Sequence, residues 1–179
     1  MNGALGAALV SMICQLTIGR KKYAGVEAEV QTILAEAEAL RARLTGLMTE
    51  DVAAFEGVMA AYKRPHETEA DQEVRTQAVQ AALKQASLIP LETARACAAV
   101  IALCRTIVGI GNVNALGDAN VGALTALAGL KGAALNVRLN LKSIRDETFV
   151  TETEAELNRI LADQEALVAT IYAMIQNKS

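Results

Sequence analysis

The sequence predicts an all-α protein, an antiparallel up-and-down bundle of about six helices in one domain spanning residues 1–179. Two observations support this fold class. Alanine and leucine abound and β-branched runs are short, which favours helices throughout. Only Pro65 and Pro90 interrupt the chain, and 53% of its residues are hydrophobic, enough to bury a substantial core. Short turns between the helices favour antiparallel neighbours.

The first helix is expected over residues 3–19, a mostly uncharged segment that precedes the basic turn 20–23. The segment is shorter than the roughly 20 residues that span a bilayer. It also contains polar residues (Ser11, Gln15 and Thr17). It lacks the basic start and the cleavage site of a signal peptide. We therefore expect a buried helix and no membrane partner.

One long amphipathic helix is predicted from about Gly25 to Tyr62, because apolar residues recur there at steps of three or four. Pro65 ends it, since the residue before a proline avoids the α region. Within it, Asp51 and Phe55 are four residues apart and share one turn. An aromatic ring beside a carboxylate suits a flat, cationic heterocycle. An isolated pair of this kind is, however, more often an exposed aspartate above a core phenylalanine.

The next helix has a recognisable start. Thr68 followed by Asp71 resembles a capping box, and we expect this third helix to run to about Ser87. Pro90 then bends or restarts the chain. A helix over 91–108, apolar all round, is expected to be buried between neighbours, and two glycines just beyond it end it.

The central helix lies within residues 112–147, where we expect the function to reside. Its small residues recur as one helical face that lets another helix approach closely: Gly122, Ala126, Gly129 and Ala133. Asp118 and Asn136 point the same way, and Asn140 lies about 40° from Asn136. Because Asp118 and Asn136 are roughly 27 Å apart along the axis, one small ligand meets both only if a partner helix or subunit completes the site. Alternatively, the asparagines satisfy backbone groups at helix contacts and Asp118 is an N-cap.

A last amphipathic helix is expected to be capped by Thr151 or Thr153, each of which has a glutamate three residues later. The net charge of -3 and the 3% aromatic content exclude a nucleic-acid footprint. Three cysteines in apolar helices (Cys14, Cys97 and Cys104) indicate buried free thiols and a reducing, cytoplasmic location. A single histidine, His66, makes a metal site improbable.

Four segments resemble one known family, in the expected order along the chain. They are Gly3–Val10, Leu16–Tyr23, Asp51–Phe55 with Val58–Lys63, and Gly132–Leu141 with the approach that carries Asp118. Helical patterning alone does not dictate their asparagines, glycines and lysines. The chain resembles the cyclodeaminase/cyclohydrolase family, which includes formiminotetrahydrofolate cyclodeaminase and the methenyltetrahydrofolate cyclohydrolases.

This resemblance implies a helical homodimer that holds a tetrahydrofolate derivative between helices, with no cofactor beyond this substrate. By the same resemblance, six residues occupy functional positions. The catalytic residues would be Asp51, Asp118 and Lys22, and the substrate-binding residues would be Phe55, Asn136 and Asn140. Relatives usually carry an additional N-terminal helix and a proline- and glycine-rich loop before the segment that begins at Gly3. That loop could offer backbone N–H groups to an anion, so its absence is expected to weaken folate binding.

The expected reaction is hydrolysis of 5,10-methenyltetrahydrofolate to 10-formyltetrahydrofolate. A carboxylate, from Asp51 or Asp118, would stabilise the cation and take a proton from water. A desolvated Lys22 would serve as the acid, and a solvated Lys22 would attract the carboxylates of folate. Formiminotetrahydrofolate cyclodeaminase is the alternative and uses nearly the same groups. That activity often accompanies a transferase domain, which favours the hydrolase here. A non-catalytic assembly module and a membrane-associated bundle are the remaining alternatives.

Overall fold

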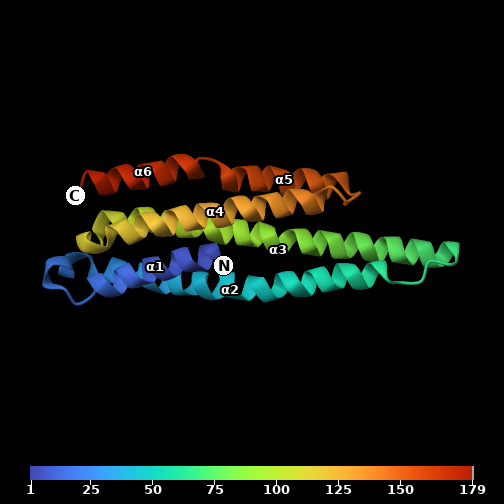
Figure 1. The fold of residues 1–179 in the computed structure, drawn as a ribbon, viewed down its shortest axis with the longest axis horizontal. Coiled ribbons are helices and arrows are strands. Elements are labelled where there is room, and N and C mark those ends of the chain that lie inside the picture. Colours follow the sequence, from blue (N-terminus) through green and yellow to red (C-terminus); the bar gives the residue numbers. More distant parts are fainter. Residues whose placement is uncertain (179) are drawn as a thin grey trace.

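A computed structural model describes residues 1–178 as six α-helices and two short 3-10 helices, with no strand in this range (Figure 1). The helices follow the chain as α1 (Asn2–Thr17), α2 (Glu27–Tyr62), α3 (Glu69–Ile110), α4 (Leu116–Leu141), α5 (Glu147–Leu161) and α6 (Gln164–Gln176). The 3-10 helices are η1 (Lys21–Val26) and η2 (Val113–Ala115). The all-α bundle predicted from composition and periodicity is therefore confirmed.

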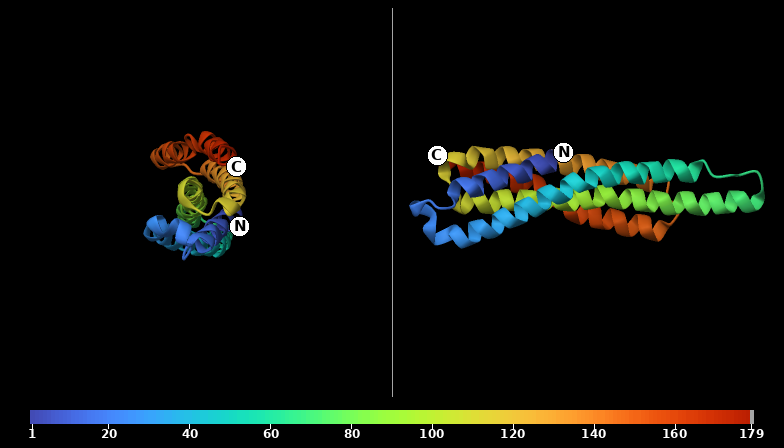
Figure 2. Two further views of the ribbon diagram at one scale, coloured as in Figure 1. Left: turned by 90° about the vertical axis from the view of Figure 1, so that its left-hand side faces the viewer. Right: turned by 90° about the horizontal axis from the view of Figure 1, so that it is seen from below.

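Helices α1 to α4 form an elongated antiparallel bundle, seen end-on in Figure 2. The long α2 and α3 form a hairpin, α4 returns along α3, and the short α1 lies against α2, α3 and α4 over only part of their length (Figures 1 and 2). Helices α5 and α6 lie outside α4, and α6 also packs against α3. Two helices, of 36 and 42 residues, are long, whereas the sequence had indicated one.

The contact between α1 and α4 brings the two backbones together. A Cβ atom on Gly6 would lie 2.7 Å from the backbone oxygen of Gly122 and 3.4 Å from the Ala126 Cβ. A Cβ atom on Gly3 would lie 2.6 Å from the Cys97 Sγ. The small-residue face predicted for the central helix therefore seats α1, because only small side chains allow such an approach.

Helix α3 runs without a break from Glu69 to Ile110, so the helix end predicted near Ser87 is wrong. Pro90 lies inside it and donates no hydrogen bond to the carbonyl of Ala86, four residues earlier. The Nδ2 of Asn140, on α4, donates to that carbonyl instead, at 3.0 Å. A tertiary contact, which the local pattern does not reveal, thus compensates for the missing N–H group.

The capping box at the start of α3 is confirmed: the Asp71 N–H donates to the Thr68 Oγ1 at 3.1 Å, and the Asp71 carboxylate accepts from the Thr68 N–H. The cap predicted for the last helix is wrong. Asp146 caps α5 by accepting the N–H of Phe149 at 3.0 Å, so the helix begins before either threonine. The chain also breaks at Asp163, whose positive φ of 61° separates α5 from α6.

All three cysteines are free thiols in the core, as predicted. Burial raises the pKa of Cys14 and Cys97 to about 11 and that of Cys104 to about 12. These thiols are therefore protonated near neutral pH and behave as small apolar side chains.

Within residues 1–178, one helix, α3, is long and apolar enough over 18 residues to cross a bilayer, and a bent arrangement that combines α1 with the η1–α2 segment passes the same test. The apolar window of α3 is 44% buried against the rest of the protein. The core helix of a protein outside the membrane passes the same test of length and composition, so this finding does not indicate a membrane span. The expectations of no membrane partner and of a cytoplasmic location remain predictions.

Candidate functional site

A cleft of about 350 Å³ lies beside the first residues of α1. Helix α1 begins at Asn2, beside the middle of the α2–α3 hairpin, so α2, α3 and α4 continue past it (Figure 1). Residues 1–3 form one wall of the cleft. The other lining residues come from three helices: Leu44, Leu47, Met48 and Asp51 of α2; Pro90, Thr93 and Cys97 of α3; Ala128, Gly129, Gly132, Ala133 and Asn136 of α4.

Two of the six predicted site residues, Asp51 and Asn136, line this cleft together. They are 85 residues apart in the sequence, and they share the cleft only because α2 and α4 both line it. Both side chains are exposed to solvent. The Asp51 carboxylate forms no hydrogen bond or ion pair with any residue in the described part of the chain.

Asp51 is the only charged side chain among the residues that line the cleft, and the N-terminal ammonium group of Met1 is a second charge beside it. The remaining polar side chains there are those of Asn2, Thr93 and Asn136, and the rest of the lining is apolar or glycine. An unpaired carboxylate at the wall of a cleft attracts a small cation. The cleft volume lies within the range of pockets that bind small organic molecules, about 300–1,000 Å³.

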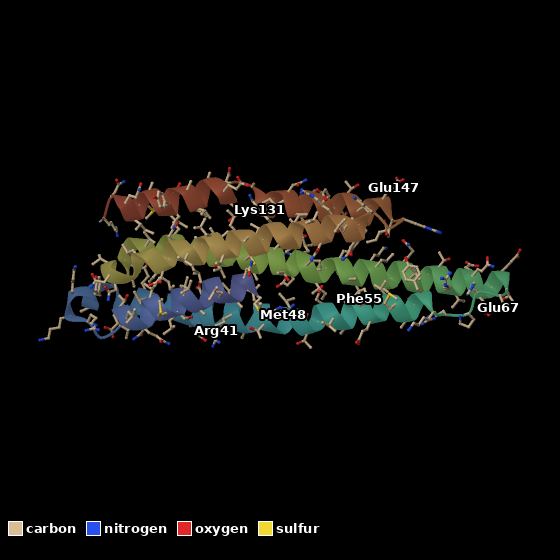
Figure 3. All side chains as sticks on the ribbon, in the orientation of Figure 1. Arg41, Met48, Phe55, Glu67, Lys131 and Glu147 are labelled. Carbon is tan, nitrogen blue, oxygen red and sulfur yellow. The ribbon has the colours of Figure 1, made fainter. Side chains whose placement is uncertain are left out.

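Phe55 lies one turn beyond Asp51 on α2 but does not line the cleft. Its side chain is 64% exposed, so the alternative of a core phenylalanine is wrong for this chain. Figure 3 shows Phe55 farther along α2 than Met48, which does line the cleft. Asn140 also lies outside the lining, half-buried, with its amide bound to the carbonyl of Ala86. The alternative that an asparagine here satisfies a backbone group at a helix contact therefore describes Asn140.

Lys22 lies in a different place, in the η1 turn at the end of α1. It is exposed and lines a separate hollow of about 310 Å³, together with Arg20, Tyr23 and the turn between α3 and α4. Its Nζ lies 5.6 Å from the centre of the Tyr23 ring, a cation–π contact. The hydroxyl of Tyr23 accepts the N–H of Val113 at 3.1 Å, which ties the lysine turn to the start of α4.

Asp118 belongs to this same end of the bundle. It is the third residue of α4 and is half-buried, but the N-cap is Ala115, so the alternative that Asp118 caps the helix is wrong. No hydrogen bond or ion pair joins its carboxylate to another residue between 1 and 178. Within one chain, Asp51 and Asn136 thus share the cleft, whereas Lys22 and Asp118 lie at the end of the bundle where α1 ends and α4 begins, and Asp118 is roughly 27 Å from Asn136 along α4.

Thr93 and Met48 also line the cleft, and neither is predicted from the sequence. Thr93 donates its hydroxyl to the Ile89 carbonyl at 3.1 Å, and its nearness to Pro90 is the only local signal that could have marked it. Met48 gives no such signal, since it looks like any apolar position of an amphipathic helix. In the described part of the chain, no three His, Cys, Asp or Glu side chains gather where they could hold a metal ion.

Fold and cleft together define an all-α bundle with one carboxylate in a groove between helices. Residues 1–159 match the formiminotransferase-cyclodeaminase family model, and the chain belongs to this family. It is 45% identical over 178 residues to the methenyltetrahydrofolate cyclohydrolase of Methylorubrum extorquens, covering 99% of this chain and 86% of that protein. It is 31% identical to the formimidoyltransferase-cyclodeaminase of Rattus norvegicus, covering 97% of this chain but only 32% of that longer protein.

A solved structure shares the fold. The formiminotetrahydrofolate cyclodeaminase from Thermotoga maritima superposes with a TM-score of 0.80 at 31% identity, covering 99% of this chain and 82% of that one. The resemblance stated from four sequence segments is therefore confirmed at the level of the family, and the relatives are enzymes by name. None of these comparisons assigns a role to an individual residue of this chain.

Proposed function

We propose that this protein hydrolyses 5,10-methenyltetrahydrofolate to 10-formyltetrahydrofolate in the cleft lined by Asp51 and Asn136. The family and the 45% identity to a methenyltetrahydrofolate cyclohydrolase support the reaction class. One observation carries the site: Asp51 is the only charged side chain that lines the cleft, and its carboxylate has no ion pair within residues 1–178. The substrate's amidinium group is flat and positively charged, which matches that environment.

The proposed reaction begins when water adds to the amidinium carbon. The Asp51 carboxylate accepts a proton from this water, and its negative charge stabilises the cation that precedes addition. The bond from the carbon of the tetrahedral adduct to N5 then breaks, the hydroxyl of the adduct gives up its proton to become the formyl carbonyl, N5 takes up a proton, and the formyl group stays on N10. Asn136, on the facing helix, offers an amide N–H to the oxygen that becomes the formyl carbonyl.

Asp118 and Lys22 would join this site from a second subunit. The exposed face of α4 consists of Gly117, Val121, Leu124, Ala128, Gly132, Leu135 and Leu139, and it is symmetric about Ala128. Its four larger residues are 48–59% exposed. A two-fold axis at Ala128 would pair Val121 with the second copy's Leu135, as the self-complementary interface of a homodimer requires.

The same axis would account for the separation of Asp118 from the Asp51 cleft. The midpoint between Asp118 and Asn136 falls at Leu127, one residue from Ala128. An antiparallel α4–α4 pair would therefore carry the second copy's Asp118, and the Lys22 turn bonded to the start of α4, toward the Asp51 cleft. This arrangement gives both residues the catalytic roles expected from the resemblance.

Activity is measured by the loss of near-ultraviolet absorbance of methenyltetrahydrofolate. Asp51→Asn should lower kcat/KM by about 100-fold or more, the contribution expected of a general base. Glu56→Gln is the matched control, because this exposed carboxylate lies on the same helix outside the cleft and has no ion pair within residues 1–178. Equal rates in wild-type protein and in both variants would remove Asp51 from the mechanism.

The shared site has its own test. Asp51→Asn and Asp118→Asn subunits are mixed, unfolded and refolded together. A mixed dimer holds one site with both aspartates intact, so random pairing should restore about a quarter of wild-type activity if each site draws on two subunits. If both aspartates act within one chain, or if Asp118 plays no part, the mixture will show no more than the average of the two separate variants.

Cyclodeamination of formiminotetrahydrofolate is the second candidate, favoured by the 31% identity to two proteins named for it. The two reactions change absorbance in opposite directions, since cyclodeamination produces the methenyl compound and releases ammonia. Supplying each substrate separately and measuring ammonia distinguishes them. The higher identity and the 86% coverage of the cyclohydrolase favour hydrolysis as the main activity.

A further inference from the structure

Pro90 creates a defect in α3 at the wall of the cleft. It is buried and lines the cleft with Thr93, across from Asp51 on α2. Because proline has no N–H group, the carbonyl of Ala86 has no partner in its own helix. A half-buried carbonyl without a partner destabilises the fold, so something else must satisfy it.

Asn140 is that partner. Its Nδ2 donates to the Ala86 carbonyl at 3.0 Å, from a different helix and 54 residues farther along the chain. Side-chain hydroxyls support the flanking turns of α3: the Ser87 Oγ donates to the Leu83 carbonyl at 2.8 Å, and the Thr93 Oγ1 donates to the Ile89 carbonyl at 3.1 Å. The bond from Asn140 is the only one of these three that joins α3 to α4.

The bond lies one helical turn from the cleft. Asn136 and Asn140 are four residues apart on α4, and the first lines the cleft while the second holds α3. Pro90 on α3 and Asn136 on α4 both line the cleft with Asp51, so the distance between these two helices is one dimension of the cleft. A hydrogen bond between side chain and backbone at this point fixes that separation more sharply than apolar packing alone, because its length and angle are restricted.

We propose that Asn140 is a positioning residue, which spans the proline defect of α3 and so sets the width of the cleft, and that it does not touch the substrate. This inference rests on the proposed function, because it takes the Asp51 cleft as the place where the folate reacts. It replaces the substrate-binding role expected for Asn140 from the family resemblance.

A double-mutant cycle with Pro90→Ala tests this role. Alanine at position 90 restores an N–H group that can donate to Ala86 within the helix. Asn140→Ala should then lower kcat/KM by about tenfold or more when Pro90 is present and by less than about twofold in the Pro90→Ala background. Asn136→Ala is the matched control, because it removes the same group one turn away and should cause the same loss in both backgrounds.

A residue that binds substrate would behave differently. If Asn140→Ala lowers kcat/KM equally in both backgrounds, Asn140 contacts the substrate and the proposal fails. Urea unfolding of the same four proteins is followed in parallel, since Asn140→Ala should lower the midpoint only when Pro90 is present. The effect of Asn140→Ala could depend on Pro90 in the unfolding midpoint but not in kcat/KM. The bond would then hold the helices together without shaping the cleft, and this result too would overturn the proposal.

The unfolding measurement also separates this inference from the proposed function. If the protein does not turn over methenyltetrahydrofolate at all, the activity arm of the cycle is lost with the proposed function. Binding of a non-reactive reduced folate to the four proteins then replaces kcat/KM. A dissociation constant that rises with Asn140→Ala only when Pro90 is present would support the positioning role, and an equal rise in both backgrounds would refute it.

Discussion

The close contact between α1 and α4 makes the stability of the fold sensitive to one methyl group at Gly6. A Cβ atom at this position would lie 2.7 Å from the Gly122 backbone oxygen and 3.1 Å from the Val100 Cγ1. The nearer atom belongs to the backbone of α4, so no rotation of a side chain can relieve the overlap. We predict that Gly6→Ala destabilises the protein by forcing α1 away from α4.

The expected magnitude follows from two opposing effects. Replacing glycine by alanine inside a helix stabilises it by about 1 kcal/mol. Overpacking a close-packed core costs typically about 1–3 kcal/mol, and a backbone overlap belongs at the upper end of that range. The net destabilisation by Gly6→Ala is therefore about 2 kcal/mol. For a protein of this length, each kcal/mol shifts the melting temperature by roughly 2–4 °C.

The assay is thermal unfolding followed by circular dichroism, with Gly57→Ala as the matched control. Gly57 is exposed inside α2, and a Cβ atom there would meet nothing within 4 Å, so this variant gains the helix propensity without the overlap. The two melting temperatures should differ by about 6–12 °C, with Gly57→Ala the more stable. A Gly6→Ala protein as stable as Gly57→Ala would refute backbone contact between α1 and α4.

Three further predictions follow from the structure. Burial raises the pKa of Cys104 to about 12. The protein should therefore keep its full stability below about pH 9, where the thiol of the unfolded chain ionises, and lose stability as the pH rises toward 12. Cys104→Ala should reduce this alkaline slope of the free energy of unfolding by about 1.4 kcal/mol per pH unit, measured by urea unfolding. The hydrogen bond from Lys84 lowers the pKa of Asp146 most, followed by the one from the Phe149 N–H, so the stabilisation of α5 by Asp146 is lost as the pH falls through its pKa in the folded protein. Asp146→Asn should make the free energy of unfolding depend less on pH in the acid range. An unchanged dependence would show that Asp146 does not contribute to it. Leu124→Glu, in the middle of the exposed α4 face, should convert the proposed dimer to a monomer in analytical ultracentrifugation, whereas a dimer that persists would place the interface elsewhere.

Several features of the fold could be predicted because they depend on nearby residues. The capping box of Thr68 and Asp71 forms between residues three apart, so its partners are fixed by the chain itself. The end of α2 before Pro65 follows from the restricted backbone beside proline. The failures had the opposite character: α3 continues through Pro90 because a residue 54 positions away satisfies the freed carbonyl.

The candidate site shows the same division. Helical periodicity predicts that Asp118 and Asn136 point in similar directions from α4 and lie too far apart to meet one ligand. It could not indicate which helix each residue faces. Asn136 and Asn140 are one turn apart, yet the first lines the cleft and the second bonds to α3. Phe55 follows Asp51 by one turn and lies outside the cleft that Asp51 lines.

By itself, the sequence determined the helical class, the buried thiols and the family, because composition, periodicity and short motifs are properties of neighbouring residues. Only the tertiary structure decided where the cleft lies and which side chains line it. The reason is geometric: α1 covers only part of the much longer α2–α3 hairpin, so the groove beyond its first turn stays open. The relative lengths and offsets of packed helices create that opening, and no local pattern encodes them.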